Sequence, residues 1–100
     1  MGDREDTEAA QLALAEQAIE QQQWALAREL MHQLACTVPQ NKHYRAQLSY
    51  ARAGELLAAG DGVRARDELE RALRLAPDHA GARAMLGRTR RPSLLSLFRR

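Results

Sequence analysis

The order of small, large and turn-forming residues between positions 49 and 87 is the feature that most restricts the fold of this chain. Two segments with helical periodicity are separated by the pair Gly60 and Asp61. Glycine reaches the left-handed conformation that ends many helices, and aspartate is a favoured N-cap residue. Pro77 and Asp78 repeat this punctuation, so we expect Asp78 to cap a third helix. The stretch therefore predicts a helix, a tight turn, a second helix and the start of a third.

Alanines provide the positions where the two helices of this stretch can approach each other. Ala53, Ala65 and Ala72 are small enough to let antiparallel helices pack closely. Larger side chains at helical spacing then fill the space on either side, namely Leu56, Leu57, Leu69, Leu73 and Leu75. The pattern predicts a closely packed helical hairpin.

This pattern resembles a tetratricopeptide repeat, which is a helix–turn–helix unit that binds other proteins. The residues that carry the resemblance are Ala53, Leu56, Gly60, Asp61, Ala65, Leu69, Ala72, Pro77, Leu86 and Gly87. A weaker copy precedes it at matching spacing and consists of Leu14, Ala15, Ala18, Ala27, Met31, Leu34 and Pro39. Its turn, residues 21–23, departs from the glycine–aspartate type. The repeat period is the separation of Ala15 from Ala53, and it exceeds the period of the family by about one helical turn. We assign this extra turn to residues 39–46.

The resemblance covers about residues 8–90 and implies an all-α fold. We expect a right-handed stack of two helical hairpins with a closing helix. The expected helices span residues 4–21, 24–37, 41–59, 62–75 and 79–90. This gives a helical domain over residues 1–91, followed by a short amphipathic, basic tail over residues 92–100.

Charge is distributed unevenly along the chain. Residues 1–20 carry six acidic side chains and one arginine, whereas residues 81–100 carry six arginines and no acid. Acids near a helix N-terminus and bases near a C-terminus complement helix dipoles. Opposite charges at the two ends also allow head-to-tail self-association of a stacked array. The acidic, polar start carries no recognisable secretory signal, so we expect a cytoplasmic protein.

The resemblance also implies where a partner would bind. The first helix of each repeat lines a concave face, and a peptide or helix lies along it. The matching positions in this chain are Leu12, Glu16, Ile19, Glu20, Gln47, Tyr50, Gly54, Leu57, Ala84 and Arg88. Tyr50 is the expected anchor, because tyrosine offers a large contact area at low entropic cost. The alternative is that Tyr50 packs beside Tyr44 or His43.

Two further observations concern the ligand of this face. Gly54 lies in the middle of a predicted helix, which indicates close backbone approach by a ligand or by a neighbouring helix. One branch of the family holds chaperone C-termini with lysines and asparagines, and this chain has neither at Leu12, Glu16 and Tyr50. The pattern instead favours an apolar peptide or helix with some positive charge.

The tail separates into two faces if it is helical. Leu94, Leu95, Leu97 and Phe98 share one arc, and Arg99 and Arg100 lie on the other with two serines. Three fates are open for this apolar arc: folding back on the domain, docking into a partner or a second copy, and binding a membrane surface.

Catalytic and metal-binding patterns are weak in this sequence. His32 and Cys36 are four residues apart on a predicted helix, but no further ligand lies nearby, so we expect a buried cysteine and no metal site. No phosphate-binding loop, carboxylate pair or activated nucleophile is recognisable, so we expect neither an enzyme nor a cofactor. The acidic N-terminus and the shortage of aromatic residues near the arginines disfavour nucleic acid.

These observations predict a non-catalytic interaction module that acts as an adaptor, co-chaperone or assembly factor. Two alternatives remain. A membrane-recruited scaffold would use the tail as its membrane contact. A self-assembling structural protein would explain why the chain has barely two and a half repeat units, since repeat arrays usually need three.

Overall fold

The protein is all-helical in a computed structural model that describes the backbone of residues 3–89 and the side chains of residues 7–89. The five helices in this part of the chain are α1 (Asp3–Glu20), α2 (Trp24–Thr37), α3 (Lys42–Ala58), α4 (Gly62–Leu75) and α5 (Ala80–Thr89). Each begins and ends within two residues of its predicted bounds. The predicted tail, with Leu94, Leu95, Leu97, Phe98, Arg99 and Arg100, lies outside the described residues.

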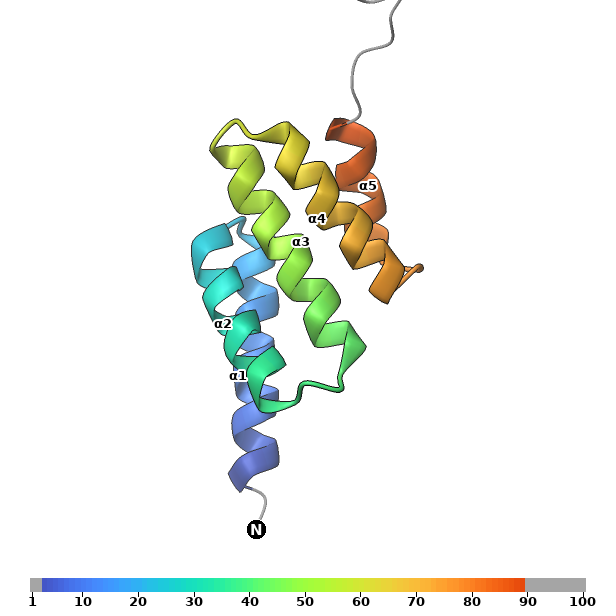
Figure 1. Ribbon diagram of the computed structural model, residues 1–100. Helices are drawn as coiled ribbons and strands as arrows, with labels where there is room; N and C mark the ends of the chain where they lie inside the picture. The colour runs from blue at the N-terminus through green and yellow to red at the C-terminus, as the bar shows by residue number, and fades with distance from the viewer. Residues whose placement is uncertain (1–2, 90–100) are drawn as a thin grey trace, which may run out of the picture.

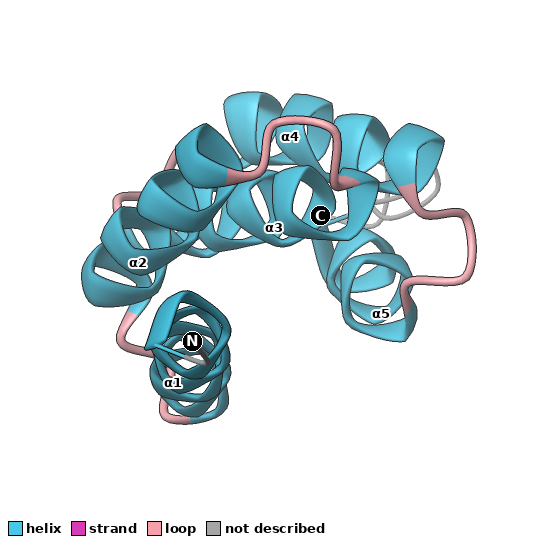
Figure 2. Cartoon of the chain, turned by 90° about the horizontal axis from the view of Figure 1, so that it is seen from below, coloured by secondary structure: helices cyan, strands magenta, loops and turns pink. Residues whose placement is uncertain are grey.

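Consecutive helices run antiparallel and form a curved stack (Figure 1). Seen along the helices, α3 lies in the middle, with α2 and α4 on either side of it on one face (Figure 2). The first and last helices, α1 and α5, lie on the opposite face, below α3 in this view (Figure 2). The middle helix therefore contributes to both faces of the stack.

The core is built around alanines at the helix contacts. Ala53, Ala65 and Ala72 are completely buried, as the sequence pattern predicted, and they surround the equally buried side chain of Leu69. α5 completes this cluster with Ala82. Because an alanine side chain extends only to Cβ, the backbones of α3 and α4 approach closely at these points. Close packing at the alanines fixes how the hairpin is assembled.

The hydrogen bonds of the turn in the first hairpin recur in the turn of the second hairpin at the equivalent positions. In the first turn, Gln23 N donates to Ala18 O at 2.8 Å, and Gln22 N donates to Ile19 O at 3.0 Å. The corresponding bonds recur from Asp61 to Leu56 and from Gly60 to Leu57 at the same distances. This is the hydrogen-bond pattern that ends helices through a left-handed residue. The turn at residues 21–23 thus has the geometry of the glycine–aspartate turn despite its different sequence.

The two turns differ in how well their central residue suits the backbone. Gly60 has a φ of 85°, and Gln22 has a φ of 58°. A left-handed conformation costs a residue with a side chain about 1–2 kcal/mol, whereas glycine adopts it freely. The first hairpin therefore contains a strained turn that the second hairpin avoids.

Side-chain contacts between α1, α2 and α3 join the two hairpins. The Tyr44 hydroxyl of α3 donates to a carboxylate oxygen of Glu8 on α1. This hydrogen bond, with burial, raises the pKa of Tyr44 to about 12. Arg28 of α2 and Glu55 of α3 form an ion pair at 2.6 Å. Because both partners of this ion pair are more than a third exposed, its contribution to stability is small.

The strained turn predicts that Gln22→Gly stabilises the protein. Glycine removes the left-handed penalty, so the free energy of unfolding should rise by about 1 kcal/mol in urea denaturation. Gln21→Gly is the matched control, because Gln21 does not have a positive φ. That variant should be neutral or destabilising. Equal effects of the two substitutions would show that the turn at Gln22 is not strained.

The buried alanine contact predicts that Ala65→Leu is destabilising. The larger side chain would force α3 and α4 apart and lower the free energy of unfolding by about 1–3 kcal/mol. The control is Glu70→Leu on the exposed side of the same helix. That substitution should change the stability by less than about 0.5 kcal/mol. A wild-type melting temperature for Ala65→Leu would contradict the close packing.

Candidate partner-binding face

The inner face is the face of the stack on which α1 and α5 lie (Figure 2), and on it Trp24 packs against Gly54. Trp24 is the first residue of α2, and its indole ring covers the backbone of α3 at Gly54. A Cβ atom at position 54 would overlap the indole ring. Of the two explanations for this mid-helix glycine, a neighbouring helix therefore accounts for the close approach. Any side chain at position 54 would displace Trp24.

Tyr50, one turn before Gly54, lies within a row of aromatic rings. It meets Trp24 edge-on, with 5.5 Å between the ring centroids, and it packs against His79 at 4.8 Å. The neighbours of Tyr50 are thus Trp24 and His79, whereas the sequence suggested Tyr44 or His43. Burial raises the pKa of the Tyr50 hydroxyl, and the nearby positive charge of Arg88 opposes this shift.

Gly81 on α5 makes room for the hydroxyl end of Tyr50. A Cβ atom at position 81 would lie 2.9 Å from this hydroxyl, which is too close for ordinary packing. Tyr50 is half-buried by these contacts. Its ring therefore holds α2, α3 and α5 together and leaves only part of its surface for a partner.

His79 caps α5 at its N-terminus. The backbone N–H of Ala82 donates to His79 Nδ1 at 2.9 Å, so the capping residue is His79 and the expectation for Asp78 was wrong. Since Nδ1 accepts this bond, Nε2 carries the proton and donates to the side-chain oxygen of Gln47 on α3. Burial is the main cause that lowers the pKa of His79 below its usual value. The neutral form of His79 therefore matches both hydrogen bonds.

Two cavities are lined by α3 and by residues at opposite ends of α5. The first has a volume of about 460 Å³, and its lining consists of Gln22, Trp24, Gly54, Leu57, Ala58, Gly62, Arg88 and Thr89. The second has a volume of about 330 Å³, and its lining consists of His43, Gln47, Ala76, Asp78, His79, Ala80 and Gly81. Tyr50 contacts Trp24 from the first cavity and His79 from the second, so it lies between them.

The structure brings together some of the predicted groove residues. Gly54, Leu57 and Arg88 line the first cavity, and Gln47 lines the second. The other predicted residues lie outside these two cavities. Leu12 and Ile19 on α1 are partly buried in the core, while Glu16 and Glu20 on α1 and Ala84 on α5 are exposed.

Two residues of the candidate face, Trp24 and His79, were not predicted from the sequence to lie there. Trp24 was assigned to the second helix but not to the inner face, and His79 was not assigned a role. The repeat contained the signal for His79, because His79 aligns with Asn41 when Ala53 is aligned with Ala15. Asn41 accepts from Tyr44 N at 3.0 Å and so caps α3 in the same way.

The pair His32 and Cys36 differs from the prediction in one respect. Cys36 is exposed, so the expectation of a buried cysteine was wrong. Its sulfur lies 3.6 Å from His32 Nε2. Within residues 7–89, no three histidine, cysteine, aspartate or glutamate side chains are grouped so that they could hold a metal ion.

Comparisons of the chain with protein-family models, with curated proteins and with solved structures gave no match.

The capping role of His79 predicts a pH-dependent stability. Its pKa is lower in the folded than in the unfolded protein, so the free energy of unfolding should be highest above about pH 6.5. It should decrease as the pH falls from there towards the lowered pKa of the folded state. Asn accepts the same backbone bond without titrating, so His79→Asn should flatten this dependence. Urea denaturation between pH 5 and pH 8 measures the free energy of unfolding of the wild type and of His79→Asn. The same dependence on pH in both proteins would contradict the role of His79.

Proposed function

We propose that this chain is a non-catalytic protein-interaction module with the architecture of a tetratricopeptide-like repeat pair and a closing helix. In this architecture α1 with α2 and α3 with α4 are the two repeats, and α5 is the first helix of a third unit. The observation that carries the proposal is the open cavity formed by Trp24, Gly54, Leu57 and Arg88 on the inner face. A partner segment would occupy it as a peptide or helix.

The recurrence of backbone geometry from the first hairpin to the second supports the repeat architecture. Both hairpins begin their second helix at equivalent residues, Trp24 and Gly62, and both second helices have 14 residues. The turns also share their hydrogen bonds. Stacked repeats of this kind create extended concave surfaces that bind polypeptides.

The chemistry of the inner face indicates the kind of segment that would bind. The first cavity offers the apolar surfaces of Trp24 and Leu57 together with the cation of Arg88. The helix α1, which lies on the same face of the stack as α5, carries the exposed residues Glu16 and Glu20. An amphipathic segment would place its apolar side chains in the cavity and a basic side chain towards α1.

A role in recruitment to a membrane would depend on residues 92–100. Within the part of the chain that the structure describes, no helix has the length and apolar character needed to cross a bilayer. The inner face supports binding of a protein segment without a membrane, and this is the function that we propose for residues 7–89.

Blocking the first cavity is expected to abolish partner binding. Ala58 is exposed and lines the cavity, so Ala58→Phe would fill it without disturbing the core. The protein would first be used to select ligands from a random peptide library displayed on phage. The affinity of the selected peptides is then measured by the fluorescence of Trp24, which is the only tryptophan. We expect a loss of at least about tenfold, because the apolar contact area is removed.

The matched control is Ala59→Phe, one residue further along the chain. Ala59 is also exposed but does not line this cavity. This variant should bind the selected peptides like the wild type. Equal binding by the Ala58 variant would rule out the cavity as the binding site. The absence of any enriched peptide would contradict the proposed function.

A further inference from the structure

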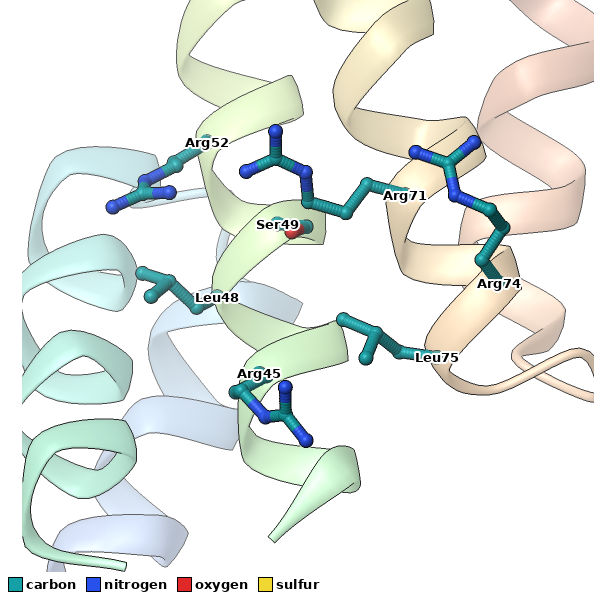
Figure 3. A pocket seen from close by; sticks show the side chains of 7 residues that line it. All are labelled: Arg45, Leu48, Ser49, Arg52, Arg71, Arg74 and Leu75. Carbon is teal, nitrogen blue, oxygen red and sulfur yellow. The ribbon is translucent and has the colours of Figure 1, made fainter. Parts of the chain in front are cut away.

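A third cavity, of about 410 Å³, lies between α3 and α4, and Figure 3 shows the side chains that line it. Seven side chains line it: Arg45, Leu48, Ser49 and Arg52 from α3, and Arg71, Arg74 and Leu75 from α4. Four of the seven are arginines and none is acidic. The cavity is therefore bordered by positive charge, with Arg45, Arg71 and Arg74 exposed and Arg52 partly buried.

These four arginines have no anionic partner within residues 7–89. Arg45, Arg52, Arg71 and Arg74 make no ion pair and no hydrogen bond there. Other arginines in the same part of the chain are engaged, as Arg28 is with Glu55. Like charges around one cavity repel each other, and a bound anion would remove this repulsion.

The repeat itself shows that the fold does not need arginines at these positions. The residues at the equivalent positions of the first hairpin, in the same order, are Thr7, Leu14, Gln33 and Cys36. None of them is an arginine or a lysine, although α1 and α2 have the same turn geometry as α3 and α4. The positive charge is thus specific to the second hairpin and is not a structural requirement of the repeat.

The rest of the lining suits a compact, highly charged ligand. Ser49 is only 2% exposed and lies on α3 between Arg45 and Arg52 (Figure 3). Leu48 and Leu75 form the walls, and none of the seven lining residues is an aromatic ring on which a nucleobase would stack. The volume is in the range of small-molecule sites. Guanidinium groups bind phosphate and carboxylate oxygens in pairs, and a phosphate group carries more negative charge than a carboxylate.

We propose that this cavity binds a small molecule that carries two or more adjacent phosphate groups. Four guanidinium groups need several negative charges for balance, and adjacent phosphates supply them within a small volume. The hydroxyl of Ser49 donates a further hydrogen bond to a phosphate oxygen. The site is separate from the inner face, so it does not depend on the proposed binding of a peptide.

The test uses the full chain and inorganic tripolyphosphate, with the affinity measured by isothermal titration calorimetry. The double substitution Arg71→Gln and Arg74→Gln should lower the affinity about a hundredfold, because each arginine supplies a charge-assisted hydrogen bond. Ser49→Ala should lower it about tenfold without changing the net charge. Circular dichroism would verify that these variants remain folded.

The matched control is Arg64→Gln with Arg83→Gln, which removes the same net charge outside the cavity. It should retain wild-type affinity within about threefold. An equal loss in both double variants would show that tripolyphosphate binds only through overall charge, and would overturn the proposal. Unchanged binding of tripolyphosphate by the double variant at Arg71 and Arg74 would also overturn the proposal.

A hexaglutamate peptide serves as the competing class of ligand. If it binds more tightly than tripolyphosphate and is affected by the same substitutions, the cavity is a site for an acidic polypeptide and the proposal is wrong. Weaker binding of hexaglutamate, with a stoichiometry of one tripolyphosphate per chain, would support the assignment.

Discussion

The structure depends on the close approach of α3 to both of its neighbours. Alanine at positions 53, 65 and 72 lets α3 and α4 pack at short distance, and glycine at position 54 lets Trp24 cover α3 from the side of α2. The contacts at the alanines need the absence of side-chain atoms beyond Cβ, whereas the contact at Gly54 needs the absence of Cβ itself. The position of the Trp24 ring on the inner face depends on the second contact, because a Cβ atom at position 54 would overlap it.

The consequence for function is that α3 carries both candidate sites. One side of this helix contributes Gly54 and Leu57 to the inner cavity, and another contributes Arg45 and Arg52 to the arginine cavity. Buried residues between these two sides, such as Ala53, fix the rotation of the helix about its own axis. Any change in packing that rotates α3 would therefore alter both sites together.

The helices and the core could be predicted because they follow from local spacing. Periodic leucines and alanines, with Gly60 and Asp61 between them, determine where the helices begin and end and which sides they bury. The aromatic row could not be predicted in this way. Trp24, Tyr50 and His79 lie far apart in the sequence, and only the packing of α2, α3 and α5 brings their rings together. The arginines of α3 and α4 likewise come from different helices, so their shared cavity was not visible in the sequence.

The repeat provides a way to separate residues that the fold requires from residues that serve another purpose. Where both hairpins have a small or apolar residue, as at Ala15 and Ala53, burial explains both positions. At other equivalent positions a neutral side chain in the first hairpin is replaced by a cationic one in the second, as Gln33 is by Arg71. Both of these side chains are exposed, so burial does not explain the replacement. Unpaired charge around a shared cavity has an electrostatic cost, and a ligand of opposite charge would offset it. The differences between two similar hairpins thus point to the arginine cavity more directly than their common features do.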